Sequence, residues 1–177
     1  MTDSLPPDPP SLFVETWINR LAAQCGGGRA LDVAMGRGRH SVVLAAAGLH
    51  VFGVDNRFEV VQSAVERVRT RGHRLAAWCA DLTMSPLPAR RFDVIVVVRY
   101  LQRDLFPTLI TALKPGGAIV YETFTVLQRG RGRGPQSADH LLGHGELRER
   151  LTGCEILFET EVVEPDALAQ IVARRPR

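Results

Sequence analysis

Residues 30–38 read Ala-Leu-Asp-Val-Ala-Met-Gly-Arg-Gly, a short apolar run that ends in a glycine-containing turn. The apolar run predicts a β-strand, and a helical pattern follows over residues 40–47. Glycine lets a backbone approach a ligand closely, and the first turn of a helix offers N–H groups without intrahelical partners. A strand that leads through such a turn into a helix is therefore a candidate ligand-binding unit.

The alternation of strand and helix patterns continues on both sides of this stretch. Further strands are expected at residues 51–54, 75–80, 92–98 and 118–123. A first helix is expected to begin at Ser11 and to end at the glycines 26–28, and further helices are expected at 58–71, 102–113 and 146–151. Such alternation predicts a parallel sheet with helices on both faces and right-handed crossovers. Only three residues separate the last two strand patterns, 154–163 and 167–173, so that pair must be antiparallel. The predicted fold is α/β, a doubly wound, mostly parallel seven-stranded sheet with an antiparallel terminal strand.

Three predicted strands end in an acidic residue. The first strand ends at Asp32, the second at Asp55 and the third at Asp81. In open parallel sheets, ligands bind outside the carboxyl ends of the strands. An acid at the end of the second strand can accept hydrogen bonds from both hydroxyls of a ribose. Each acid alone could be a structural cap, but three in succession, with glycines after the first, favour a nucleoside-like ligand.

The glycine turn departs from the dinucleotide-binding fingerprint, and this limits the class of ligand. The dinucleotide fingerprint Gly-x-Gly-x-x-Gly has Ser41 at its third glycine, and Asp32 is poorly suited to lie beside a pyrophosphate. A cationic ligand suits that acid better. S-adenosylmethionine carries a sulfonium, an amine and a ribose but no phosphate, so it is favoured over NAD.

At this point the chain resembles the class I S-adenosylmethionine-dependent methyltransferases. Residues 31–38 resemble their first motif, with Ala34 in place of its first glycine, and residues 53–55, 80–82, 92–95 and 113–117 resemble later motifs. The antiparallel terminal pair also fits that family. The resemblance and the strand-end acids together assign cofactor binding to Asp32, Ala34, Gly36, Arg37, Gly38, His40, Asp55, Asn56, Asp81, Leu82 and Val98.

Shorter strings resemble one branch of the family. They lie at residues 36–41, 99–101, 121–124 and 139–142, and they are similar to the small bacterial tellurite-resistance-type methyltransferases. That branch implies a small soft or anionic methyl acceptor, which is nucleophilic without a general base; an oxygen or nitrogen acceptor would need one.

Candidate acceptor residues lie at the strand ends and in neighbouring segments. They are Arg99, Tyr100, Arg103, Tyr121, Glu122, Thr123, His40 and His140. Arg99 and Arg103 are four residues apart and would make a cationic mouth if they share a helix face, or would be solvated helix residues. Tyr100 or Tyr121 could contact a sulfonium through its ring, although a core-packing tyrosine is the stronger alternative. For His40, helix capping is favoured over a role in the site. His140 could lie either in an active-site loop or in an exposed loop, and the sequence does not distinguish the two.

A long Gly/Arg-rich loop spans residues 126–145 and carries Arg129, Arg131 and Arg133. A mobile surface loop is the first interpretation, an acceptor lid the second and an RNA-binding segment the third. Its length slightly favours a function.

Composition limits the remaining classes. The chain has 177 residues with 45% hydrophobic and 23% charged residues, which fits one globular domain over residues 11–177 behind a flexible, proline-containing tail at 1–10. No apolar run is long enough for a membrane helix, no secretory signal is visible, and the three cysteines lack metal-like spacing. A cytoplasmic protein without a membrane, metal or nucleic-acid partner is expected, despite a net charge of +3. The oligomeric state is left open.

The predicted function is therefore transfer of a methyl group from S-adenosylmethionine to a small, anionic or thiol/chalcogen acceptor. Two alternatives stay open. One is a noncatalytic cofactor- or RNA-binding module on the same fold, since no general base is obvious. The other, less favoured, is a nicotinamide-dependent oxidoreductase.

Overall fold

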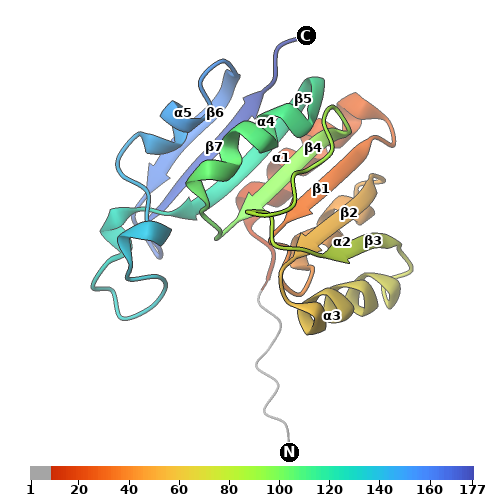
Figure 1. The fold of residues 1–177 in the computed structure, drawn as a ribbon, viewed down its shortest axis with the longest axis horizontal. Coiled ribbons are helices and arrows are strands. Elements are labelled where there is room, and N and C mark those ends of the chain that lie inside the picture. Colours follow the sequence, from red (N-terminus) through yellow and green to blue (C-terminus); the bar gives the residue numbers. More distant parts are fainter. Residues whose placement is uncertain (1–8) are drawn as a thin grey trace, which may run out of the picture.

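The computed structural model describes residues 9–177, and within that range seven strands form one sheet (Figure 1). The strands are β1 (Arg29–Val33), β2 (His50–Asp55), β3 (Leu75–Cys79), β4 (Phe92–Val98), β5 (Leu113–Phe124), β6 (Glu155–Val162) and β7 (Leu168–Arg174). The helices are α1 (Leu12–Cys25), α2 (Arg39–Ala46), α3 (Phe58–Arg69), α4 (Phe106–Ala112) and α5 (Glu146–Arg150). Of the tail predicted at 1–10, residues 1–8 lie outside the described residues.

The strand order is β3-β2-β1-β4-β5-β7-β6. The pairs among β1 to β5 are all parallel, whereas β7 runs antiparallel to both of its neighbours. This confirms the predicted α/β, mostly parallel seven-stranded sheet. The winding direction reverses between β1 and β4, and a crevice for ligands is expected outside the carboxyl ends of the strands at that point.

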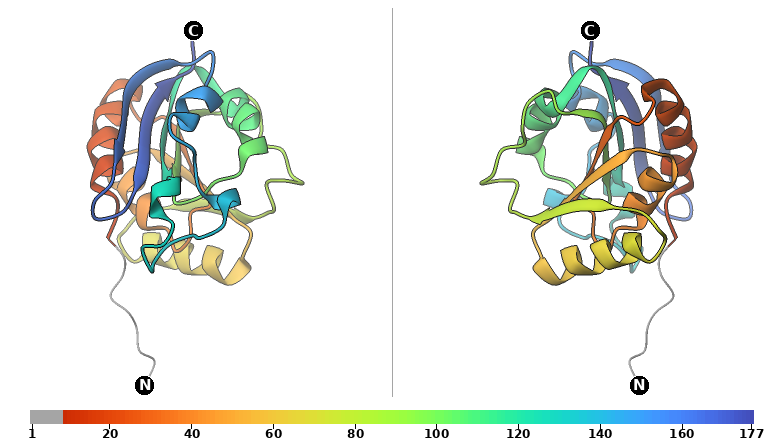
Figure 2. Two further views of the ribbon diagram at one scale, coloured as in Figure 1. Left: turned by 90° about the vertical axis from the view of Figure 1, so that its left-hand side faces the viewer. Right: turned by 90° about the vertical axis from the view of Figure 1, so that its right-hand side faces the viewer.

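Helices cover both faces of the sheet (Figure 2). Helices α1, α2 and α3 lie on one face, and α4 and α5 lie on the other. Residues of β4 alternate between the two: Val94 and Val96 pack toward α1 and α2, and Ile95 and Val97 pack toward α4. A strand buried on both faces is apolar at every position, which explains the continuous run at 92–98.

Two predicted boundaries were wrong. Strand β5 begins at Leu113 rather than 118, because the Lys114–Gly117 segment stays extended: Gly116 and Gly117 pair with Arg175, and Lys114 Nζ lies 2.7 Å from Asp93 Oδ2. The helix expected at 102–113 is a 3₁₀ turn at Arg103–Leu105 followed by α4. Pro107 lies in the first turn of α4, where its missing N–H costs no hydrogen bond.

No helix in the described part of the chain combines the length and apolar character that a bilayer-spanning segment requires.

Candidate functional site

A pocket of about 170 Å³ lies at the carboxyl ends of the strands. Its lining comes from the segments that follow β1, β2, β3 and β4. The lining residues are Ala34, Val54, Asp55, Asn56, Arg57, Ala80, Asp81, Leu82 and Tyr100. The crevice expected at the switch point is therefore present.

The carboxylate of Asp55 joins two sides of this pocket. Its Oδ2 accepts the backbone N–H of Gly36 at 2.9 Å, and its Oδ1 accepts the N–H of Arg57 at 3.2 Å. Asp55 is 9% exposed, at the wall of the pocket. A carboxylate can accept about four hydrogen bonds, so two sites remain for a pair of ligand hydroxyls.

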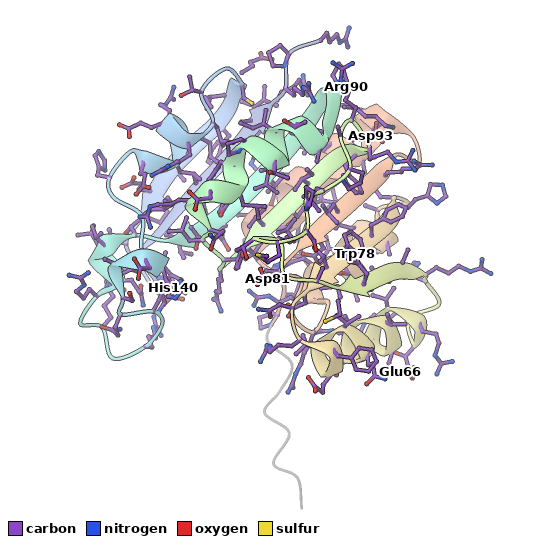
Figure 3. The ribbon with its side chains drawn as sticks, viewed as in Figure 1. Glu66, Trp78, Asp81, Arg90, Asp93 and His140 are labelled. Carbon is purple, nitrogen blue, oxygen red and sulfur yellow. The ribbon has the colours of Figure 1, made fainter. Side chains whose placement is uncertain are left out.

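Asp81 also lines this pocket, at the carboxyl edge of the sheet (Figure 3). Its Oδ1 accepts hydrogen bonds from the hydroxyl and the backbone N–H of Thr83, and these bonds lower the pKa of Asp81. The adjoining Leu82 is half-buried and lines the same pocket. The wall thus offers an ionised carboxylate beside an apolar side chain, a combination that fits an amino-substituted heterocycle.

Tyr100 closes the pocket at the end of β4. Burial raises the pKa of its phenol, and the negative charges of Asp81 and Asp55 raise it further, so the ring remains neutral between the two carboxylates. Its carbonyl accepts the hydroxyl of Tyr121 at 2.9 Å. Of the two tyrosines proposed from the sequence, Tyr100 is the one at the pocket.

Asp32, the first of the three strand-end acids, is not a lining residue. It is 1% exposed, and its Oδ2 accepts the Ser41 hydroxyl at 2.7 Å. Burial raises the pKa of Asp32 to about 7. The carboxylate therefore ties the end of β1 to α2 beneath the glycine turn.

The glycine turn itself has three residues in the left-handed region. Ala34 has φ 51°, Gly36 φ 54° and Gly38 φ 73°. A Cβ at Gly38 would come within 2.9 Å of Ala64 Cβ, so a glycine there allows α2 to start against α3. Gly36 contributes its N–H to Asp55, whereas the Arg37 side chain is exposed and does not line the pocket.

His40 and Glu122 belong to a buried network with Ser11. His40 Nε2 accepts the backbone N–H of Ser11 at 3.1 Å, and Glu122 Oε2 accepts the Ser11 hydroxyl at 2.9 Å and Gln170 Nε2 at 2.7 Å. Burial lowers the pKa of His40 to about 3. Because Ser11 is the N-cap of α1, this bond fits the capping alternative for His40.

Arg99 and Arg103, for which a cationic mouth and a pair of solvated helix residues were both open, each contact an acid outside the pocket lining. Arg103 binds Glu146 through two nitrogens, at 2.7 and 3.0 Å, and donates to the Leu141 carbonyl at 2.9 Å. Arg99, with φ 54°, lies 3.6 Å from Asp166. Arg99 directly follows β4, whereas Arg103 begins the 3₁₀ turn Arg103–Leu105, so the two residues do not share a helix face.

Three other predicted residues lie away from the pocket. Tyr121 is 1% exposed and stacks on Phe106 with the ring centroids 5.2 Å apart, which fits the core-packing alternative. His140 is exposed, and Figure 3 shows it on its loop, apart from Asp81. Val98 is buried at the end of β4 and does not line the pocket.

The Gly/Arg-rich loop is attached to the turn between β6 and β7. Arg131 pairs with Glu164 at 3.3 Å and Arg133 with Asp166 at 2.9 Å. The buried Gln128 accepts the Ala167 N–H at 2.7 Å and so adds a third attachment. These contacts give the loop a defined position at the carboxyl edge.

Sequence reasoning missed Val54, Arg57 and Ala80, which also line the pocket. Each lies within two residues of Asp55 or Asp81. A wider window around the strand-end acids would have included them.

The sheet order and the pocket at its switch point define a Rossmann-like methyltransferase fold. An S-adenosylmethionine-dependent methyltransferase from Mesorhizobium loti superposes with a TM-score of 0.72 and 20% identity, over 90% of this chain and 96% of that chain. The [4+2]-cyclase SpnF superposes with a TM-score of 0.76 and 19% identity, over 92% and 80%. At such identities the likeness concerns the fold alone.

Sequence comparison adds evidence on the class of protein. Residues 30–117 match a family model described as a methyltransferase domain. Together with the fold, this match supports a class I S-adenosylmethionine-dependent methyltransferase, and it implies S-adenosylmethionine as the cofactor.

Two named relatives agree with that class. The demethylmenaquinone methyltransferase of Clavibacter sepedonicus is 36% identical over 112 residues, 60% of this chain and 45% of that protein. The ubiquinone biosynthesis O-methyltransferase of Idiomarina loihiensis is 29% identical over 123 residues, 66% of this chain and 51% of that protein. The chain spans about half the length of the curated relatives it matches.

Proposed function

We propose that this chain transfers the methyl group of S-adenosylmethionine to a small acceptor at the pocket between Asp55, Asp81 and Tyr100. The observation that carries the proposal is the Asp55 carboxylate, which is fixed by the Gly36 N–H and still has acceptor sites at the pocket wall. A ribose diol supplies the two donors that these sites require.

The remaining lining residues fit the rest of the cofactor. Leu82 offers an apolar contact for the adenine, and Asp81 offers an acceptor for its amine. Ala34 lines the pocket at the glycine turn, where the methionine end of the cofactor would lie. The Tyr100 ring is available for a cation–π contact with the sulfonium. When bound, the cofactor supplies an electrophilic methyl group for in-line displacement.

The titratable groups near the strand ends favour an acceptor that needs no proton removed. His40 is a poor base because its Nε2 already accepts from Ser11 and burial keeps its pKa at about 3. Glu122 Oε2 already accepts two hydrogen bonds. A thiolate or chalcogen oxyanion is nucleophilic as it stands, and the protein then contributes alignment and exclusion of water. The small bacterial branch indicated by the sequence motifs has acceptors of this kind.

The relatives' names support a small acceptor but point to a different chemistry. One is named an O-methyltransferase of ubiquinone biosynthesis, and a hydroxyl acceptor requires a base to take its proton. The two acceptor classes are therefore separable by experiment.

The test is formation of S-adenosylhomocysteine with a panel of acceptors: a small thiol, selenite, tellurite and catechol. The proposal expects product with the thiol or an oxyanion, at a rate that rises with pH through the acceptor's own pKa. Turnover of catechol alone would contradict the acceptor class. Binding of the cofactor without turnover of any acceptor would favour the noncatalytic alternative. Asp55→Ala should strongly lower turnover at subsaturating S-adenosylmethionine because cofactor binding is weakened, and Glu155→Gln, which changes an exposed carboxylate on β6, serves as the matched control.

A further inference from the structure

A second cavity lies on the face of the sheet where no helix covers β2 and β3. The connection between β3 and β4, residues 80–91, crosses this face in place of a helix (Figure 1). Beneath it is a cavity of about 320 Å³. Its lining residues are Arg29, Phe52, Trp78, Ser85, Pro86, Leu87, Pro88, Arg91 and Phe92.

Most of this lining is aromatic or apolar. Phe52 and Phe92 meet edge to face at 5.8 Å, and Trp78 projects from β3 beside them. Phe92 is 3% exposed, but Phe52 and Trp78 are only half-buried, so their rings present an apolar surface to the cavity. Flat rings of this kind stack on a flat ligand ring.

The charged part of the lining is positive. In the described part of the chain, the guanidinium groups of Arg29 and Arg91 have no hydrogen-bond or ion-pair partner. Asp93, which accepts the Arg29 backbone N–H at 2.8 Å, is already paired with a cation: its Oδ2 lies 2.7 Å from Lys114 Nζ. Two arginines without an internal partner beside an apolar cavity are complementary to an anion.

We infer that this cavity binds a small molecule that has a flat aromatic ring and an anionic group. The ring would lie against Trp78 and Phe52, and the anion would meet Arg29 and Arg91. A volume of about 320 Å³ is at the low end of the range for small-ligand sites.

This cavity is separate from the cofactor pocket. Residues 80–82 of the β3–β4 connection line the cofactor pocket, and residues 85–88 line the aromatic cavity. Figure 3 shows that this connection runs from one edge of the sheet to the other: Asp81 lies at the carboxyl edge, and Arg90 and Asp93 lie at the opposite edge.

The probe for a test is 2-naphthoate, measured by isothermal titration calorimetry with the intact protein. Its uncharged analogue 2-naphthylmethanol tests the role of the anion, and cyclohexanecarboxylate tests the role of the ring. We expect 2-naphthoate to bind at one site and each analogue to bind at least 10-fold more weakly. Saturating S-adenosylhomocysteine should leave the binding unchanged.

The double variant Arg29→Gln/Arg91→Gln should weaken 2-naphthoate binding at least 10-fold. Arg74→Gln removes an exposed arginine at the same edge of the sheet that does not line the cavity, and it should change the affinity less than twofold. Equal binding of the uncharged analogue, an unaffected double variant, or displacement by S-adenosylhomocysteine would overturn the inference. Much tighter binding of a single-stranded oligonucleotide than of 2-naphthoate would also overturn it, in favour of a nucleic-acid surface.

Discussion

The Asp55 carboxylate at the end of β2 accepts the backbone N–H of Gly36, 19 residues earlier in the chain, at 2.9 Å. This bond joins the glycine turn after β1 to the acid after β2, so the two predicted elements of the site form one wall of the pocket. A change in the turn therefore acts on the position of the acid.

Ala34 in the glycine turn offers a test of backbone strain. It lies in the left-handed region, with φ 51°, where the family motif has glycine. Ala34→Gly relieves about 1–2 kcal/mol of backbone strain and costs about 0.4–1 kcal/mol in unfolded-state entropy. We expect a net gain of about 0.5–1 kcal/mol, measured by urea unfolding. A lower midpoint than that of the original protein would show that the alanine is not strained.

Gly38→Ala should have the opposite effect. The new Cβ would meet Ala64 Cβ at 2.9 Å and Ala64 Cα at 3.1 Å, and φ would stay at 73°. Gly48→Ala is the matched control, because Gly48 has φ 82° but no atom within 4 Å of the added Cβ. Gly48→Ala should cost about 1 kcal/mol, and Gly38→Ala about 1–3 kcal/mol more, the usual range for overpacking. Equal losses for the two variants would refute the close contact between α2 and α3.

His40 should make the protein sensitive to acid. Its pKa is about 3 in the folded protein, against an ordinary value of 6.5. Below pH 6.5 the unfolded chain gains a proton on this residue while the folded protein does not, so stability falls as the pH drops from 6.5 toward 3.

His40→Gln retains an acceptor for the Ser11 N–H and removes this titration. The difference in unfolding free energy between the two proteins should change with pH by up to about 1.4 kcal/mol per unit between pH 6 and 4. The comparison is made as a difference because buried Asp32, with its pKa raised to about 7, acts in the opposite direction in both proteins. A difference that does not vary with pH would contradict the assignment.

Arg103 should prove to be a structural residue. Its bonds to Glu146 and to the Leu141 carbonyl connect the 3₁₀ turn after β4 to the segment before α5. Arg103→Met should lower stability by about 1–3 kcal/mol, because the partly buried Glu146 loses the closer of its two arginine partners and keeps only Arg150 at 3.0 Å. The affinity for S-adenosylhomocysteine should stay within twofold.

Arg148→Met is the control for that change, because Arg148 pairs with Glu159 on an exposed surface. This substitution should lower the free energy of unfolding by less than about 1 kcal/mol. If Arg103→Met instead raised the KM for an anionic acceptor without a loss of stability, the cationic-mouth interpretation would be supported.

The sheet and part of the pocket lining could be predicted from the sequence because both depend on local pattern. Asp55, Asn56, Asp81 and Leu82 follow directly from where strands end, and all four line the pocket. The position of Asp32 could not be predicted. In a strand that is buried on both faces no alternation of polar and apolar residues shows which way a side chain points, and Asp32 turned out to face Ser41 in the core.

The acceptor side was less predictable for a different reason. Arg103 and Glu146 are 43 residues apart, and nothing in the spacing of charges indicates that they pair. The same holds for the Ser11 network, in which Glu122 lies 111 residues from its partner. Contacts of this kind depend on how the chain returns across the sheet, and only the three-dimensional arrangement reveals them.

The most direct test of the central claim is calorimetric titration of S-adenosylhomocysteine into the protein, Asp55→Ala and Glu155→Gln, with NAD as a further ligand. A charge-assisted hydrogen bond is worth about 1.5–3 kcal/mol, so the loss of two such bonds to a ribose corresponds to at least about a 100-fold change in Kd. The account predicts one site in the original protein and in Glu155→Gln, a loss of that size in Asp55→Ala, and no heat with NAD. An affinity that is unchanged in Asp55→Ala, or tighter binding of NAD than of S-adenosylhomocysteine, would contradict it.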